Sequence, residues 1–179
     1  MAAAFGGLGL HAATPGPAGS MAPPLPAELR RAAGLPAGAG FIAMFVHPQC
    51  PCTPAGVDEL AAVLEAGADR AVLMVVFSPR RRPVGWSEVA VVDLARRLPG
   101  ASCVEDPDGH LAELAGAGTS GHVLVVDPDD RCLFAGGVTA ARGHTGSNDS
   151  SRSLQAVLAG VATAARRPVF GCAMAEDRR

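Results

Sequence analysis

The stretch FIAMFVHPQCPCT, residues 41–53, decides the fold because it joins an unbroken apolar run directly to two cysteines. The run from Phe41 to Val46 contains no polar residue, which is typical of a strand covered on both faces. Cys50 and Cys52 follow at once, and Thr53 can cap a helix that starts after them. The sequence therefore predicts a buried strand that delivers two thiols to its end.

Along the rest of the chain, apolar runs of strand length alternate with segments of helical periodicity. The expected strands are 41–46, 71–77, 102–105, 123–126 and 132–135, and the expected helices are 53–66, 86–98, 110–117 and a final helix capped by the serines at 150, 151 and 153. This order predicts an α/β domain in which helices flank a mixed, mainly parallel central sheet that ends in an antiparallel C-terminal hairpin.

We expect the globular domain to span residues 41–172, with 173–179 as a tail. Residues 2–13 are mildly apolar but shorter than the roughly 20 residues of a membrane helix. They are either the end of a truncated signal or anchor, or a disordered leader. The six prolines within residues 14–40 predict a linker. The whole of 1–40 is thus expected to lie outside the packed domain.

Composition excludes several classes of function. The chain has no lysine among its 179 residues, so it contains neither a P-loop nor a pyridoxal Schiff base. A net charge of -2 gives no general attraction to phosphate backbones, and nucleic acid is not expected as a partner. No cofactor is expected. The bias toward Ala, Gly, Pro and Arg suggests a bacterial source.

The other three cysteines are distant from this pair in the sequence. Cys103 and Cys132 lie in apolar surroundings, and we interpret both as buried structural residues. Cys172 lies in the C-terminal sequence PVFGC and has three interpretations: a resolving thiol, a metal ligand or a buried residue.

Four segments together resemble the bacterial RedB-type proteins of the thioredoxin-like superfamily. They are HPQCPCT (47–53), TSGHVLVVD (119–127), GGVTAARGHTGSN (136–148) and PVFGC (168–172). The resemblance implies a thioredoxin-like fold, a redox-active cysteine pair and a thiol or disulfide protein partner. RedB-type proteins usually carry a membrane-spanning segment before an extracytoplasmic domain. This implies a membrane-associated, extracytoplasmic protein whose anchor is missing, or a cytoplasmic one if the leader is complete as written.

The chain differs from thioredoxins in two respects. Thioredoxins have two residues between their cysteines, whereas this chain has only Pro51. Thioredoxins also carry a cis-proline against the active-site sulfurs, and the matching place here is near Ser120 and Gly121. The usual substrate-docking edge depends on that proline.

The leading hypothesis is thiol–disulfide exchange at the CPC motif, Cys50-Pro51-Cys52. Two residues of extended chain span about 7 Å and a disulfide needs Cα atoms roughly 4.4 to 6.8 Å apart, so a bridge here needs a bent backbone. A strained bridge is easily reduced, which predicts an oxidising pair. The helix start and His47 favour the thiolate. We assign attack to Cys50 and resolution to Cys52.

Two alternatives remain open at the sequence level. The two thiolates can bind a soft ion such as copper or zinc, with His47, His144 or Cys172 as further ligands, and no spacing establishes which metal if any is bound. The domain can also be a non-catalytic interaction module, because a fold does not fix a function.

Overall fold

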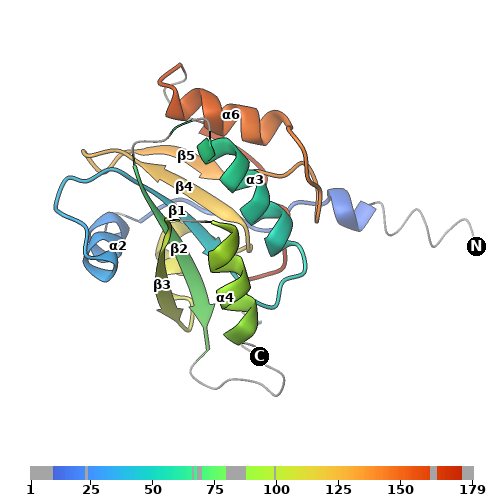
Figure 1. Cartoon of the computed structure of the whole chain (residues 1–179), viewed down its shortest axis with the longest axis horizontal. Coiled ribbons are helices and arrows are strands. Elements are labelled where there is room, and N and C mark those ends of the chain that lie inside the picture. The colour runs from blue at the N-terminus through green and yellow to red at the C-terminus, as the bar shows by residue number, and fades with distance from the viewer. Residues whose placement is uncertain are drawn as a thin grey trace, which may run out of the picture.

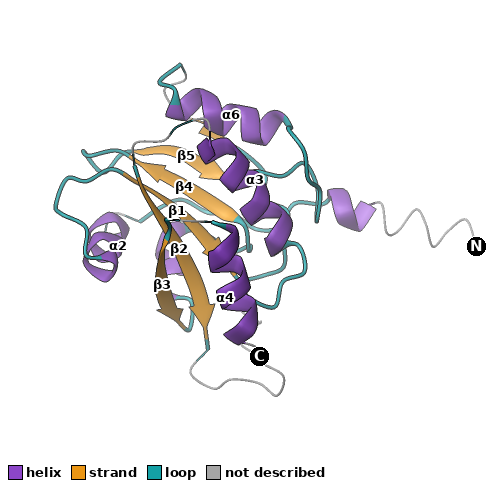
Figure 2. Ribbon diagram, viewed as in Figure 1, coloured by secondary structure: helices purple, strands orange, loops and turns teal. Residues whose placement is uncertain are grey.

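The computed structural model describes residues 10–22, 24–65, 67, 70–79, 88–98, 100–161 and 165–174. The elements appear in Figure 1 and, coloured by type, in Figure 2. In chain order they are α2 (Leu25–Ala33), β1 (Phe41–Val46), α3 (Thr53–Glu65), β2 (Ala71–Ser78), α4 (Glu88–Arg97), β3 (Ser102–Pro107), α5 (His110–Ala115), β4 (His122–Val126), β5 (Cys132–Gly136), α6 (Asp149–Leu158) and β6 (Ala165–Arg166).

The strands form one sheet in the order β3-β2-β1-β4-β5-β6. Strands β1, β2 and β3 are parallel, β4 is antiparallel to both β1 and β5, and β6 is parallel to β5. The mixed, mainly parallel sheet and its antiparallel hairpin are therefore as predicted. Because of these strand directions, the C-terminal ends of β1, β5 and β6 lie at the same end of the sheet as the N-terminal end of β4.

Helices cover both faces of the sheet, and β1 contributes alternate side chains to each. Phe41, Ala43 and Phe45 pack with α2 and α5, whereas Ile42, Met44 and Val46 pack with α3, α4 and α6. Figure 1 shows α3, α4 and α6 in front of the sheet. All six β1 residues are 0 % exposed, as an apolar run covered on two faces requires.

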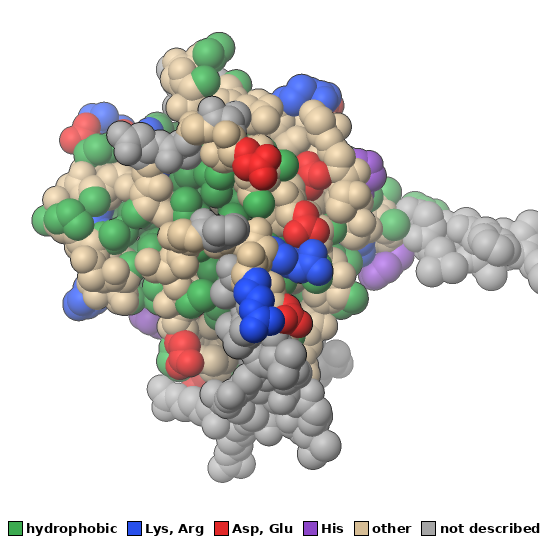
Figure 3. Space-filling model, viewed as in Figure 1, with side chains coloured by type: hydrophobic (Ala, Val, Ile, Leu, Met, Phe, Trp, Pro, Cys, Tyr) green, Lys and Arg blue, Asp and Glu red, His purple; other side chains and the backbone are tan. Residues whose placement is uncertain are grey.

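On the outer side of the front helices, arginine and acidic side chains are interspersed (Figure 3). Arg97 of α4 pairs with Asp58 of α3 at 2.8 Å between Arg97 Nη1 and Asp58 Oδ2. No helix in the described part of the chain is long and apolar enough to cross a bilayer. Residues 1–9 of the expected leader lie outside the described residues.

The segment 14–40 differs from the expected linker because it contains a packed helix. Helix α2 starts directly after Pro24 and holds Pro26 in its first turn, where a missing N–H costs nothing. Leu25 and Leu29, one helical turn apart, are both 0 % exposed within the core of the β1 face that also holds α5. The proline-rich composition concealed this spacing, and the packed domain begins before Phe41.

Smaller differences concern element ends. The cap of α6 is Asn148, whose side chain accepts from the N–H groups of Ser150 and Ser151, while the Ser151 hydroxyl completes a capping box. Strand β6 was not expected, because a two-residue strand has no periodicity to detect. Residues 86 and 87 of the second predicted helix lie outside the described residues.

Replacing Leu29 with alanine tests whether α2 belongs to the core. We expect Leu29→Ala to lower the free energy of unfolding by about 2–5 kcal/mol, because it leaves a cavity between α2 and the sheet. Denaturant titration measures the loss. Leu10→Ala is the matched control, because Leu10 is 72 % exposed, and it should change stability by less than about 0.5 kcal/mol. Equal stability of both variants would contradict the packing.

Candidate functional site

The two neighbouring cysteines lie in the turn between β1 and α3. The N–H of Cys50 donates to His47 O at 3.0 Å, and the N–H of Thr53 donates to Cys50 O at 3.1 Å, so the turn leads directly into α3. Cys50 is 3 % exposed, Cys52 is half-buried and Pro51 is exposed. The predicted delivery of two thiols from a buried strand to a helix start is present.

A third cysteine reaches the pair from the C-terminal end of the described chain. The N–H of Cys172 donates to Cys50 Sγ at 3.3 Å, and the Cys172 thiol is hydrogen-bonded to the same sulfur. The Cys172 carbonyl accepts from the N–H of Ser120 at 2.8 Å. The sulfur of Cys50 is thus the centre of a three-thiol cluster, which we define as Cys50, Cys52 and Cys172.

The pKa of Cys50 lies below the ordinary value for a thiol. Burial by itself raises this pKa, but hydrogen bonds to the sulfur outweigh the burial. The N–H of Cys172 donates to this sulfur at 3.3 Å, and the Cys172 thiol, the N–H of Cys52 and the Thr53 hydroxyl also lower the pKa of Cys50. Because these groups stabilise the charged form, Cys50 is the member of the cluster best suited to nucleophilic attack.

The other two thiols are shifted in the opposite direction. Burial and the neighbouring Cys50 raise the pKa of Cys52, and the same two causes, with a contribution from Cys52, raise the pKa of Cys172 to about 12. The guanidinium of Arg142 opposes both shifts. Of the three thiols, Cys50 is therefore the first to ionise, and Cys52 and Cys172 keep their protons to higher pH, as expected when acidic groups share one site.

Ser120 lies near the place that we expect to match the cis-proline of thioredoxins. Its Oγ accepts from the N–H of His47 at 2.8 Å and lies 2.8 Å from Thr53 Oγ1. Within the described residues no peptide bond is cis. Ser120 fastens the loop before β4 to the turn that carries the cysteines, which gives this predicted supporting residue a structural role.

The two histidines proposed as supporting residues lie in different surroundings. His47 stacks on Phe77 with 5.2 Å between ring centroids, and its Nδ1 accepts from the N–H of Gln49 at 3.2 Å. His144 is exposed, and its N–H donates to Ala141 O. Among the residues that the structure describes, no three His, Cys, Asp or Glu side chains form a group that could hold a metal ion. The described residues therefore contain no donor set that supports the metal hypothesis.

Arg142 interacts electrostatically with Cys52 and Cys172 and was not among the predicted site residues. Its side chain donates from Nη1 to Gly171 O and from Nε to His11 O, and its N–H donates to Ala12 O at 3.0 Å. The glycine-rich loop that carries it is held by buried Glu59 of α3, which accepts from the N–H of Gly146. His144 was the residue predicted from this loop, whereas Arg142 is the residue of the loop whose charge acts on the thiols.

The remaining two cysteines lie outside the cluster. Cys132 is half-buried, and its thiol donates to Phe134 O at 3.2 Å. Cys103 was expected to be buried, but it is exposed, because β3 is an edge strand and Cys103 is not part of either core. It supplies a control thiol for the experiments below.

Solved structures similar to this chain support the fold. A conserved protein of Geobacillus kaustophilus matches with a TM-score of 0.63 and 16 % identity, covering 94 % of this chain and 93 % of its own. Protein SMc02350 of Sinorhizobium meliloti matches with a TM-score of 0.62 and 18 % identity, covering 94 % of each chain. A thioredoxin-like protein of Aeropyrum pernix matches with a TM-score of 0.50 and 17 % identity, covering 72 % of this chain and 81 % of its own.

No family model and no curated protein matches the chain. The structural neighbours confirm the predicted thioredoxin-like fold. At these identities they bear on the fold alone.

Cys172→Ala should raise the pKa of Cys50, because it removes the thiol that donates to the Cys50 sulfur while the Cys172 N–H remains. Thiolate absorbance near 240 nm, followed against pH, measures the first ionisation of the cluster. Cys172→Ser is the matched control, since its hydroxyl keeps a donor and the shift should be smaller. An unchanged first ionisation in Cys172→Ala would show that the Cys172 thiol does not stabilise the thiolate.

Ser120→Ala should destabilise the junction by about 1–3 kcal/mol, because the His47 N–H loses its acceptor and the buried Thr53 hydroxyl loses a partner. Urea unfolding provides the measurement. The control is Ser147→Ala, whose side chain is exposed and should matter little. If the two variants unfold alike, Ser120 does not fasten the junction.

Proposed function

We propose that this protein is a thiol–disulfide oxidoreductase in which Cys50 exchanges disulfides with a protein partner. The observation that carries the proposal is the Cys50 sulfur in the turn between β1 and α3, which accepts from the N–H of Cys172 at 3.3 Å and whose pKa is lowered by the hydrogen bonds around it. Such a sulfur is a thiolate at a lower pH than an ordinary cysteine, and the thiolate is the nucleophile in disulfide exchange. Its place at the end of the central strand fits the thioredoxin-like fold.

The exchange proceeds in two steps that conserve electrons. The Cys50 thiolate attacks one sulfur of the partner's disulfide, which forms a mixed disulfide and expels the partner's other sulfur as a thiolate that takes a proton from water. A second thiol of this protein then loses its proton, attacks Cys50 and expels the partner's first sulfur. Two electrons pass from this protein to the partner, and the reverse sequence oxidises a partner dithiol.

Cys52 is the second thiol within the CPC motif, and we keep it as the resolving residue of that motif. Burial and the neighbouring Cys50 raise the pKa of Cys52, so Cys52 loses its proton at higher pH than Cys50. The supporting residues of the proposed site are His47, Pro51 and Ser120 in the two loops, with His144 on the glycine-rich loop and Cys172 at the C-terminal side.

We further propose membership of the RedB-type group and an extracytoplasmic location. The four segments that carry the resemblance support the first. The second rests on the same resemblance, because RedB-type proteins usually carry a membrane-spanning segment before an extracytoplasmic domain. Anchoring to a membrane remains a proposal that rests on the apolar leader.

Cys50→Ser should abolish disulfide exchange, because serine provides no thiolate. The measurement is release of a fluorescent thiol from a peptide disulfide mixed with the reduced full-length protein. Cys103→Ser should keep the wild-type rate, since this exposed thiol lies outside the cluster. A wild-type rate in Cys50→Ser would reject the proposal and favour a non-catalytic interaction module.

A further inference from the structure

The C-terminal residues 171–174 pair with the loop before β4 as a short extra strand. Thr119 and Ala173 form an antiparallel bridge, flanked by the hydrogen bonds from Ser120 N–H to Cys172 O and from Met174 N–H to Gly118 O. An added strand of this kind takes up the main-chain groups of a sheet-like edge. The pairing fixes the register of Cys172 over Cys50.

Close packing specifies this register. A Cβ atom added to Gly171 would lie 2.1 Å from Ser120 O, so no other residue fits there without a shift of the backbone. The Arg142 side chain donates from Nη1 to the Gly171 carbonyl. The residue before Cys172 is thus clamped between two loops.

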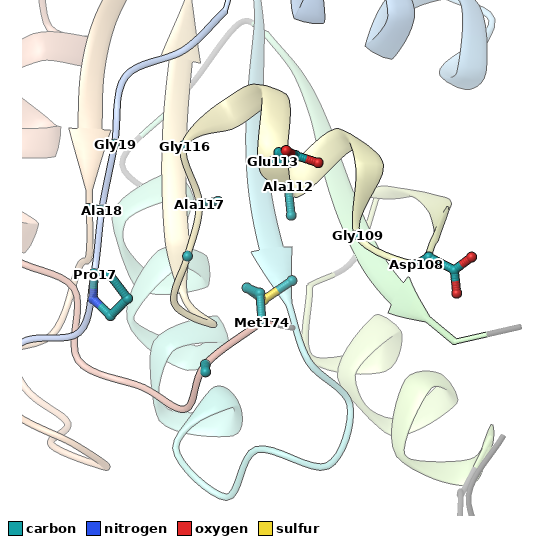
Figure 4. A pocket seen from close by; sticks show the side chains of 12 residues that line it. Pro17, Ala18, Gly19, Asp108, Gly109, Ala112, Glu113, Gly116, Ala117 and Met174 are labelled. Carbon is teal, nitrogen blue, oxygen red and sulfur yellow. The ribbon is translucent and has the colours of Figure 1, made fainter. Parts of the chain in front are cut away.

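Two apolar side chains anchor the segment on either side of Cys172. Val169 is 1 % exposed and Met174 is 2 % exposed. Figure 4 shows Met174 between the segment of Pro17 to Gly19 and helix α5, at a cavity of about 620 Å³. Burial of both anchors means that Cys172 is carried by a packed segment and not by a frayed end.

We propose that Cys172 is a second redox thiol, which forms the intramolecular disulfide with Cys50 in preference to Cys52. This inference rests on the proposed function and names the residue that completes it. Cys172 meets Cys50 across 122 positions of sequence, on an independent segment. Cys52 is also close to Cys50, but a disulfide across the single residue Pro51 needs a bent backbone, whereas Cys172 approaches from a separate segment that carries no such constraint.

The charges in the cluster give the order of the two steps. Burial keeps the pKa of Cys172 high, and the hydrogen bond and negative charge of Cys50 add to it. When Cys50 enters a mixed disulfide its charge disappears, so two of these causes vanish while Arg142 stays. The Cys172 thiol then becomes more acidic, loses its proton to water, attacks Cys50 Sγ and expels the partner's thiolate.

The segment also covers Cys50, whose side chain is 3 % exposed. The pairing with Gly118 and Ser120 holds Cys172 beside the Cys50 sulfur. Main-chain pairing therefore favours the resolving step.

Peptide mapping distinguishes the two disulfides, because cleavage at arginine places Cys172 on a different peptide from Cys50 and Cys52. Trypsin yields residues 32–70, which contain both Cys50 and Cys52, and residues 167–178, which contain only Cys172. A Cys50–Cys52 disulfide stays inside the first peptide, whereas a disulfide to Cys172 links the two. The full-length reduced protein is equilibrated with glutathione buffers of rising potential, quenched in acid, alkylated, digested and analysed by mass spectrometry.

We expect the linked pair of peptides to be the major oxidised species in the wild type and in Cys52→Ser, and to be lost in Cys172→Ser. Cys103→Ser is the control and should match the wild type. An internal disulfide in 32–70 with Cys172 unlinked would overturn the inference but leave the proposed function standing. A linked pair in Cys50→Ser at wild-type yield would assign the bond to Cys52 and also overturn it.

The proposed function itself would be rejected if, at every potential, peptide 32–70 had neither an internal disulfide nor a link to peptide 167–178, and Cys50 carried no glutathione. A second variant guards against a folding defect in Cys172→Ser. Gly171→Ala keeps all thiols but forces the backbone from Ser120, so it should increase alkylation of Cys50 and decrease the linked pair. Unchanged values of both quantities in Gly171→Ala would contradict the role of the segment.

Discussion

The N–H of Cys172 donates to the sulfur of Cys50 at 3.3 Å and joins two parts of the chain that are 122 positions apart. This contact gives the site its chemistry, because a buried sulfur without donors has a raised pKa, whereas Cys50 has a lowered one. The donors come from the turn after β1 and from the C-terminal segment. Neither part alone would make Cys50 a nucleophile.

The sheet brings these parts together through its strand directions. Strands β1, β5 and β6 end at the edge where the antiparallel β4 begins, so the cysteine turn, the loop around Ser120 and the chain after β6 meet there. Helices α3 and α6 pack on the same face, and Glu59 of α3 fixes the loop that presents Arg142. The fold thus converts distant segments into one cluster.

The strands and main helices could be predicted because their periodicity is local, as in the apolar run of β1 and the spacing of Leu60 in α3. Helix α2 could not, because proline content concealed the pair Leu25 and Leu29. The roles of Cys172 and Arg142 also depend on tertiary contacts with no local pattern. A sequence indicates which residues can react, whereas the partners of their sulfur atoms are set by strand order.

The two departures from thioredoxins have one physical explanation. The N–H of Ser120 donates to Cys172 O at 2.8 Å, and a proline at this position has no N–H to donate. Serine in place of the cis-proline therefore permits the C-terminal segment to pair with the loop. A bridge between Cys50 and Cys52 needs a bent backbone because only Pro51 separates them, and the proposed role of Cys172 removes that requirement. The paired segment thus links the two departures.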